Sequence, residues 1–200
     1  MKPRLRTTLV LILLTVCWCG SAVAGFLILE KYKATPGEQG VVRSQWPENT
    51  SVDFAPRVYN FVLALHPHCP CSRATVGELA RILDRLHVKV CLHVLVYRPA
   101  GSAGDWDSST LLDEVAALSG ARLHVDIDAA EAERFGILTS GGLVLYGVHG
   151  ELLFQGGITP SRGHAGDTAA QDAIRERLLG QASTLYTAPV FGCPLREPRS

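Results

Sequence analysis

The stretch VYNFVLALHPHCPCSRA, residues 58–74, joins an apolar run to a motif with two histidines and two cysteines. Residues 58–65 are apolar and rich in β-formers, a pattern typical of a strand buried on both faces. Prolines interrupt the run, and over residues 72–86 apolar side chains return at helical spacing. These side chains are Val76, Leu79, Ile82, Leu83 and Leu86. The stretch therefore predicts a strand, a cysteine-bearing turn and a helix, in that order.

Strands and helices are also predicted over the rest of the chain. Further strands are predicted at residues 88–96, 121–127, 143–146 and 152–154. Further helices are predicted at residues 111–118, 129–135 and 168–179. The last two strands form a hairpin, because Gly147 and Gly150 lie at the turn between them. The order β-α-β-α-β-α-β-β-α predicts an α/β fold, a mixed sheet with helices on both faces.

The N-terminal segment has the composition of a membrane span. Lys2, Arg4 and Arg6 precede an uncharged run over residues 7–29, and a bilayer core requires about 20 apolar residues. The positive flank favours a cytoplasmic N-terminus. The alternative is a signal peptide cleaved near Ala24. We favour an uncleaved single-pass anchor, because the apolar sequence resumes directly after Ala24. Both interpretations export the remainder, to the periplasm or an equivalent compartment.

The chain's 200 residues have room for one domain with appendages. The predicted organisation is an anchor at 1–29, a tether at 30–55, a domain at 56–180 and a tail at 181–200. The formal net charge is +0, and the chain lacks the basic footprint of nucleic-acid binding. Nucleic acid is therefore excluded as a partner.

The six cysteines divide by position. Cys17 and Cys19 lie in the apolar segment, and Cys91 lies in a predicted central strand, where a cysteine usually packs as a small apolar residue. The close pair after the first strand is predicted to do chemistry. A helix N-terminus favours a thiolate, so Cys69 is expected to attack substrate disulfides and Cys71 to resolve the mixed disulfide.

Two further interpretations of the pair stay open. A permanent Cys69–Cys71 disulfide would close a small ring, which we expect to be strained and easily reduced. His68 and His66 either favour the thiolate as cations or, as neutral imidazoles, join the two sulfurs as ligands of copper or zinc. The alternatives to redox catalysis are therefore a metallochaperone-like copper protein without enzymatic activity and a non-catalytic docking domain.

Cys193 is the one cysteine in the irregular tail, between Gly192 and Pro194. An extended chain covers about 3.3 Å per residue, so the tail is long enough to return to the cysteine pair. We therefore expect Cys193 to be a redox-partner candidate for Cys69 and Cys71.

Four segments together resemble the thioredoxin superfamily and, within it, membrane-anchored, exported RedB-type thioredoxin-like proteins. They are HPHCPCSRA, FGILTSGGLVLY, LLFQGGITPSRGHAGD and PVFGCPL. The resemblance implies a thioredoxin-like fold over residues 57–179. In thioredoxins two residues separate the cysteines and a cis-proline lies opposite them. Here Pro70 alone separates the pair, and Gly141 takes the place of the cis-proline.

The thioredoxin-like order also implies that residues 156–167 return to the cysteine end of the sheet, so Arg162 and His164 are candidates to line the cleft. The resulting hypothesis is an exported, membrane-anchored thiol–disulfide oxidoreductase. Its expected substrates are protein thiols or disulfides, and it needs no cofactor. Catalysis is assigned to Cys69, Cys71 and His68.

Overall fold

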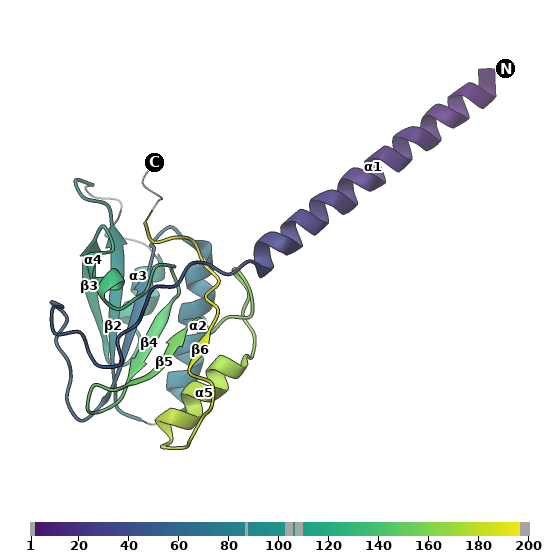
Figure 1. Cartoon of the computed structure of the whole chain (residues 1–200). Helices are drawn as coiled ribbons and strands as arrows, with labels where there is room; N and C mark the ends of the chain where they lie inside the picture. Colours follow the sequence, from purple (N-terminus) through teal and green to yellow (C-terminus); the bar gives the residue numbers. More distant parts are fainter. Residues whose placement is uncertain (1–2, 87, 103–105, 107–109, 197–200) are drawn as a thin grey trace. The chain divides into compact units, whose positions relative to one another are not determined.

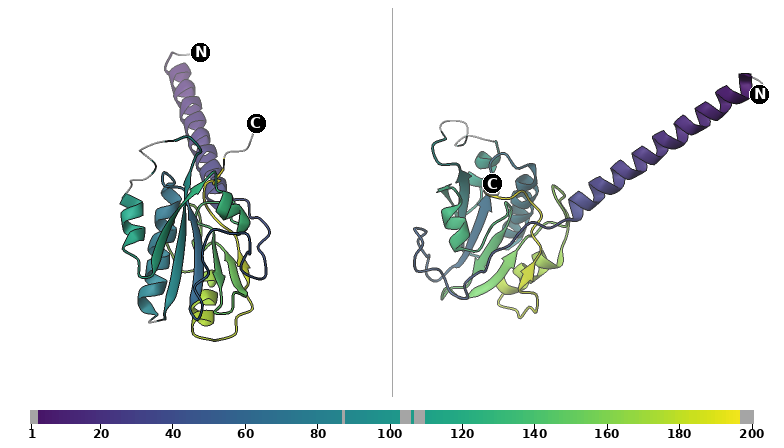
Figure 2. Two further views of the ribbon diagram at one scale, coloured as in Figure 1. Left: turned by 90° about the vertical axis from the view of Figure 1, so that its left-hand side faces the viewer. Right: turned by 45° about the horizontal axis from the view of Figure 1, so that its top comes forward.

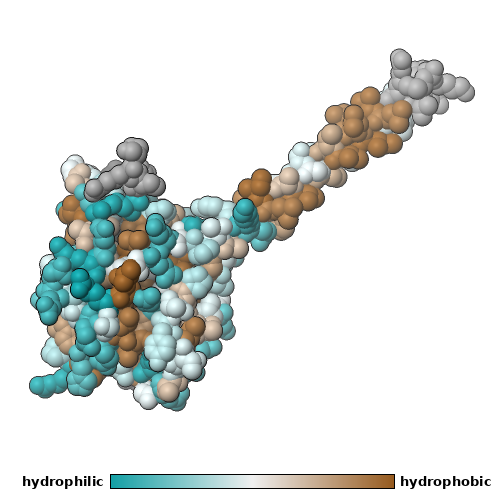
Figure 3. Space-filling view, in the orientation of Figure 1, coloured by the Kyte–Doolittle hydropathy of each residue, from teal (hydrophilic) through white to brown (hydrophobic). Residues whose placement is uncertain are grey.

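The computed structural model describes residues 3–86, 88–102, 106 and 110–196 (Figure 1). The chain forms two compact units, Met1–Thr35 and Pro36–Ser200. The first unit is one helix, α1 (Pro3–Ala34). Over Thr7–Ala34 it is long and apolar enough to cross a membrane, and an 18-residue window within it has a mean hydropathy of 2.3; Figure 3 colours much of it as hydrophobic. A membrane anchor and a signal sequence share this property.

The second unit is built on a six-stranded sheet in the order β3-β2-β1-β4-β5-β6 (Figure 2). Its strands are β1 (Tyr59–Leu65), β2 (Val90–Arg98), β3 (Ala121–Ile127), β4 (Leu143–Tyr146), β5 (Leu152–Gly156) and β6 (Thr187–Ala188). The first three strands run parallel, and β4 is antiparallel to both β1 and β5. The short β6, which the sequence did not predict, pairs with β5 in parallel.

Helices pack on both faces of this sheet. They are α2 (Pro70–Arg85), α3 (Thr110–Ala116), α4 (Ala130–Arg134) and α5 (Ala169–Leu178). On β1, Phe61 and Leu63 share a buried cluster with apolar residues of α2, α3 and α5. The alternate residue Val62 lies in a second cluster with Ala132 of α4. The predicted mixed sheet with helices on both faces is confirmed, and the fold is thioredoxin-like.

Residues 36–55 pack against the sheet unit instead of forming the predicted tether. The Trp46 amide donates to the Gly150 carbonyl at 2.9 Å, and the Trp46 ring packs edge-on against Phe135 and Tyr146. Val52 is only 2% exposed. The segment is mostly polar and contains glycines, so its few apolar side chains form no periodic pattern that would predict packing. In addition, α1 continues to Ala34, beyond the predicted end at residue 29.

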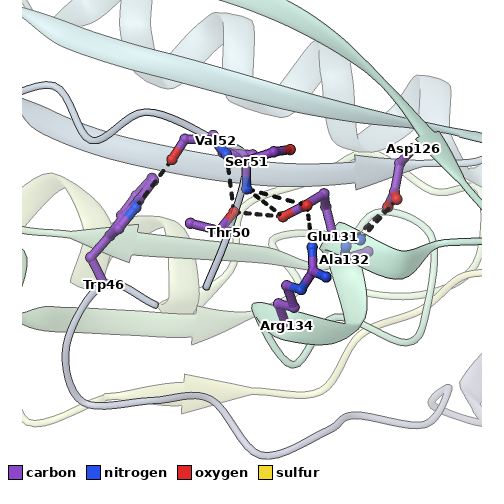
Figure 4. Close-up of polar contacts among 8 residues, drawn as sticks. All are labelled: Trp46, Thr50, Ser51, Val52, Asp126, Glu131, Ala132 and Arg134. Atoms are coloured by element: carbon purple, nitrogen blue, oxygen red, sulfur yellow. Dashed lines mark hydrogen bonds and ion pairs between the residues drawn. The ribbon is translucent and has the colours of Figure 1, made fainter. Parts of the chain in front are cut away.

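Carboxylates join this segment to α4 (Figure 4). Glu131 accepts a hydrogen bond from the Thr50 hydroxyl at 2.5 Å and from the Ser51 amide at 3.2 Å. The Asp126 carboxylate accepts from the amides of Glu131 and Ala132 at 2.8 and 2.9 Å. The Asp126 bonds satisfy backbone donors at the start of α4, which have no partner within the helix, and the Glu131 bonds join α4 to Thr50 and Ser51. Together they hold α4 and residues 50–51 on the face of the sheet opposite α2.

Candidate functional site

Cys69 lies between the end of β1 and the start of α2. It is the N-cap residue of the helix, with an extended backbone, and Pro70 occupies the first helical position. The Cys69 amide donates to the His66 carbonyl at 3.0 Å, and its carbonyl accepts from the Ser72 amide at 3.1 Å. Proline suits this position because its missing N–H would have no partner there. The local sequence thus places the Cys69 sulfur at the positive end of a helix.

Cys193 approaches Cys69 from the C-terminal tail. The two sulfur atoms lie 3.2 Å apart as free thiols. The tail is held by two backbone hydrogen bonds, from the Ser140 amide to the Cys193 carbonyl and from the Leu195 amide to the Leu138 carbonyl, each 2.9 Å long. The structure therefore brings together Cys69 and a cysteine 124 residues away.

The three thiols differ in acidity. Burial raises the pKa of Cys69, but hydrogen bonds from the Cys193 backbone and thiol and from the Cys71 backbone outweigh it and leave this pKa below its usual value. Burial and the charge of Cys69 raise the pKa of Cys71. Burial and the hydrogen bond to Cys69 raise the pKa of Cys193 to about 12. Among these three thiols, the negative charge therefore rests most easily on Cys69.

Two serine hydroxyls support the turn that carries Cys69. The His66 amide donates to the Ser140 hydroxyl at 2.8 Å, and the hydroxyls of Ser140 and Ser72 lie 2.8 Å apart. Ser72 and Ser140 are both fully buried. A hydrogen bond from Ser72 also lowers the pKa of Cys69, after the larger contributions of burial and Cys193. These serines link the start of α2 to the residues before β4.

Gly141, expected opposite the cysteine pair, has a backbone that suits glycine. Its φ is +86°, and a Cβ atom there would lie 2.8 Å from the Thr75 hydroxyl oxygen on α2. Its amide donates to the Ala64 carbonyl at 2.8 Å, so it continues the pairing of β4 with β1. No cis peptide bond occurs in the described residues. Gly141 thus has a trans backbone paired to β1 and lies beside Thr75 of α2, and it is not among the residues that line the cleft at Cys69.

The loop after β5 returns to the cysteines, as the fold implies. Arg162 donates to the Gly192 carbonyl of the tail, and its charge lowers the pKa of Cys71 and of Cys193, though less than burial raises them. His164 is exposed, and its ring contacts the Arg162 carbonyl at 2.7 Å. Arg162 therefore contacts the tail next to Cys193 and acts on the thiols by its charge, whereas His164 contacts the backbone of its own loop.

Aromatic rings form one wall beside Cys69. His66 stacks on Tyr97 at 5.2 Å between ring centroids, and His68 lies 4.5 Å from Trp106. In the described part of the chain, no hydrogen bond joins His68 to the Cys69 sulfur. A cleft of about 820 Å³ opens here; we name it the Cys69 cleft. It is lined by His66, His68, Cys69, Tyr97, Pro99, Trp106 and residues 193–196.

A second group of sulfur and imidazole lies in the sheet. The Cys91 sulfur is 3.3 Å from His93 Nε2, and His93 Nδ1 is 3.1 Å from His124 Nε2. We name these three residues the Cys91 cluster. Burial raises the pKa of Cys91 and lowers that of His93 to about 4. Across the described residues, no group of three or more His, Cys, Asp or Glu side chains is arranged to hold a metal ion.

Several residues at this site carry no signal in a single sequence. Ser72, Ser140, Tyr97 and Trp106 are ordinary residue types, and only the fold brings them to Cys69. Glu78 on α2 is similar: it is 1% exposed, accepts from the Gly166 amide at 2.6 Å and so holds the loop that carries Arg162. In the sequence, the position of a glutamate between the apolar residues Val76 and Leu79 is the one signal that could have marked Glu78.

No protein-family model and no curated protein matches this chain. Solved structures do resemble it. An uncharacterised conserved protein from Geobacillus kaustophilus is 14% identical, with a TM-score of 0.58 over 84% of this chain and 94% of that one. A hypothetical protein from Sinorhizobium meliloti is 16% identical, with a TM-score of 0.58 over 82% and 100%. The structure of MTB dsbF is 13% identical, with a TM-score of 0.45 over 70% and 98%. At these identities the similarity concerns the fold alone.

Proposed function

We propose that this chain is a membrane-anchored thiol–disulfide oxidoreductase whose globular unit works outside the cytoplasm. One observation carries the proposal: the Cys69 sulfur, at the N-terminus of α2, lies 3.2 Å from the Cys193 sulfur in a thioredoxin-like fold. A thiolate is the attacking species in disulfide exchange. The lowered pKa of Cys69 beside thiols of raised pKa supports Cys69 in this role.

In the first step, the Cys69 thiolate attacks one sulfur of a substrate disulfide. A bond forms between Cys69 and that sulfur, and the other substrate sulfur leaves as a thiolate. In the second step Cys71, as a thiolate, attacks the Cys69 sulfur and closes the Cys69–Cys71 disulfide. The bond between Cys69 and the attacked substrate sulfur breaks in the same step, and that sulfur leaves as a thiolate. Two electrons pass from the protein to the substrate, and the reverse sequence oxidises a dithiol.

The charge of Cys69 affects the pKa of its neighbouring thiols, and this explains why Cys69 reacts before they do. Before reaction, the Cys69 charge contributes to the raised pKa of Cys71 and of Cys193. The mixed disulfide removes that charge, so the pKa of each neighbouring thiol falls once Cys69 has reacted. Cys71 is our assigned resolving thiol, and Cys193 is a redox-partner candidate because its sulfur already contacts Cys69.

We assign His68 a supporting role. Its exposed ring packs beside Trp106 at the mouth of the Cys69 cleft. A protonated imidazole near the mouth would favour the thiolate by charge, without a direct hydrogen bond. His68→Gln is therefore expected to slow attack by Cys69.

The proposed substrates are protein thiols or disulfides, because Cys69, although only 4% exposed, lines the Cys69 cleft and the chain carries its own redox pair. We assign the chain to RedB-type proteins on the four sequence segments quoted above. Retention of α1 as an anchor is part of the proposal, with the cleaved, secreted form as its alternative. In the described residues no group of three or more His, Cys, Asp or Glu side chains is arranged to hold a metal ion, and the metal content of the purified protein tests the copper alternative.

A redox titration tests the proposal. The purified protein is equilibrated in glutathione buffers of graded potential, free thiols are alkylated, and the label on each cysteine is counted by mass spectrometry. Cys69 and one partner thiol should titrate together as a two-electron couple. Metal content is measured on the same sample. A Cys69 that stays labelled at every potential would contradict the assignment.

A further inference from the structure

The outer strand β3 exposes apolar side chains. Leu123, Val125 and Ile127 are 41%, 53% and 40% exposed, and we name these three residues the β3 edge. Because β3 is the last strand on its side of the sheet, no strand pairs with its outer side in the described part of the chain (Figure 1). Among the described residues of the sheet unit, the other exposed large apolar side chains are Val41, Leu179 and Tyr186.

The backbone of the β3 edge also faces outward. The Leu92 amide donates to the Gly120 carbonyl and the Asp128 amide donates to the Arg98 carbonyl, each at 2.9 Å. Gly120 and Asp128 flank β3 and direct these backbone groups toward β2, and successive strand residues alternate in this direction. Even-numbered residues of β3 therefore bond to β2. The N–H and C=O groups of the three edge residues, which are odd-numbered, point to the open side.

The opposite edge of the sheet is protected by its own chain. There β6 has only two residues. The Gly37 amide donates to the Val190 carbonyl at 2.7 Å, and the Gln39 side chain donates to the Ala188 carbonyl at 2.8 Å. Proteins protect their sheet edges by such cover, by short strands, or by charges and prolines on the edge. In contrast, β3 has seven residues, and those that face outward are neither charged nor proline.

We propose that β3 is a dimerisation edge that pairs with β3 of a second copy of this chain. The two strands run antiparallel about a two-fold axis at Val125. Val125 lies opposite Val125 of the other copy, and Leu123 lies opposite Ile127 on either side of the axis. Each of these pairs exchanges two backbone hydrogen bonds, and the two six-stranded sheets become one continuous sheet.

The strand is complementary to itself in this register. Aliphatic side chains lie opposite one another along the β3 edge, and such cross-strand pairs stabilise a sheet. On the other face, the exposed Arg122 of each copy comes next to the half-buried Asp128 of the other, and opposite charges attract across a strand pair. A register centred on His124 would place His124 opposite itself and Ile127 opposite Ala121, with less apolar contact. A second copy therefore fits this edge in both shape and charge.

Disulfide crosslinking tests this pairing on the full chain in lipid vesicles. Serine replaces the cysteines at positions 17, 19, 69, 71 and 193, and Cys91, inside β2, is retained. In this background Val125→Cys places its Cα atom about 5.5 Å from that of its counterpart, a separation that a disulfide spans. Copper phenanthroline takes up the two electrons that the thiols lose. A covalent dimer should form, and electrophoresis without reductant measures its yield.

Leu123→Cys in the same background is the matched control. It lies on the same edge and face and is similarly exposed, but in the proposed register it is offset from its counterpart by about 14 Å along the strand. It should form about tenfold less dimer than Val125→Cys, since this separation is too long for a disulfide. Adding Ile127→Cys to Leu123→Cys places thiols opposite each other again and should restore the dimer.

A charge at the centre of the edge provides a second test. In the Leu123→Cys, Ile127→Cys protein, Val125→Lys places two ammonium groups opposite each other, which destabilises a strand pair and should lower the dimer yield by about fivefold or more. Leu179→Lys is the control, because Leu179 is 55% exposed and lies after α5, and it should leave the yield unchanged. Circular dichroism verifies that both variants are folded.

The outcomes separate the dimer from its register and from the exchange chemistry. Equal yields for Val125→Cys and Leu123→Cys would indicate random collisions and would overturn the dimer. Failure of the double variant to form a dimer would overturn the register centred on Val125, and an undiminished yield with Val125→Lys would do the same. The residues described as lining the Cys69 cleft do not lie on β3, so each of these failures would leave the proposed function intact.

Discussion

The Cys69 cleft and the Cys91 cluster use the same two residue types in opposite surroundings. Cys69 follows the end of β1, at a helix N-terminus and beside hydrogen-bond donors, and its pKa is lowered. Both cysteines are only 4% exposed, but Cys91 lies within β2, where burial raises its pKa. Its histidine neighbour, His93, has a pKa of about 4 and is neutral at pH 7. A thiol next to an imidazole is therefore not by itself a reactive thiol: the donors around the sulfur decide.

The largest expected difference between the regions is in activity. Cys69→Ser should reduce disulfide exchange to background, because a serine hydroxyl is not a nucleophile toward disulfides at neutral pH. Cys91→Ser should leave the rate unchanged, since its sulfur lies inside the sheet. Reduction of a disulfide-linked fluorogenic peptide, driven by dithiothreitol, measures both. Comparable losses in the two variants would remove the distinction drawn here.

The second difference is in acid stability. The folded pKa of His93 is about 4, against about 6.5 when unfolded, so the unfolded chain binds more protons between these values. The stabilising contribution is complete above pH 6.5 and is lost as the pH falls to about 4. The loss amounts to about 3 kcal/mol.

Urea unfolding of residues 36–200 from pH 7 to pH 4 measures this loss. His93→Gln should flatten the pH dependence even if it lowers stability at pH 7, whereas Cys69→Ser should retain the full slope. An unchanged slope in His93→Gln would assign the acid sensitivity to other groups, such as His124, whose pKa burial also lowers.

The third difference is in disulfide pairing. Oxidised protein, blocked with alkylating reagent at lysis, should contain Cys69 bridged to Cys71 or Cys193, and Cys91 only as a free thiol. Cys71→Ser should accumulate mixed disulfides with substrate. Non-reducing peptide mapping identifies each species. Cys193 found only as a free thiol, with Cys193→Ser turning over at the normal rate, would reduce the tail to a packing segment.

The sequence predicted most of the fold because its information is local. Apolar runs and helical spacing locate the strands and helices from β1 to α5 within a few residues, and periodicity is the direct consequence of burial. It missed β6, two residues long, because its formation depends on pairing with β5 and not on its own composition. It likewise treated residues 36–55 as a tether, because a few apolar side chains in a polar segment leave no period.

The candidate site was only partly predictable for the same reason. The HPHCPC motif and the glycine pair at 141–142 stand out by residue type, and the fold implies that Arg162 returns to the thiols. The docking of residues 192–195 consists of backbone hydrogen bonds to residues distant in sequence. Such bonds have no residue signature, so Cys193 was identified as a candidate from its isolation and reach alone.

The smallest expected effect comes from one arginine in each region. The charge of Arg162 lowers the pKa of Cys71, and that of Arg122 lowers the pKa of His93, each secondary to burial. Arg162 is half-buried and donates to the Gly192 carbonyl, whereas Arg122 is exposed on β3. Salt screens exposed charges more than buried ones, so the two arginines should respond differently to ionic strength.

Arg162→Gln should raise the pKa of Cys71 and slow its alkylation by about two- to fivefold at fixed pH. Cys71 is the thiol to monitor because the same substitution loosens the tail that carries Cys193. Arg122→Gln should raise the pKa of His93, which is measured by NMR of its imidazole ring. In 1 M salt the Arg122 effect should disappear, while part of the Arg162 effect remains, since a Debye length of about 3 Å screens groups that water surrounds. Equal salt sensitivity at the two sites would mean that Arg162 is solvated like a surface charge. Its contact with the tail would then contribute nothing to thiol acidity in the Cys69 cleft.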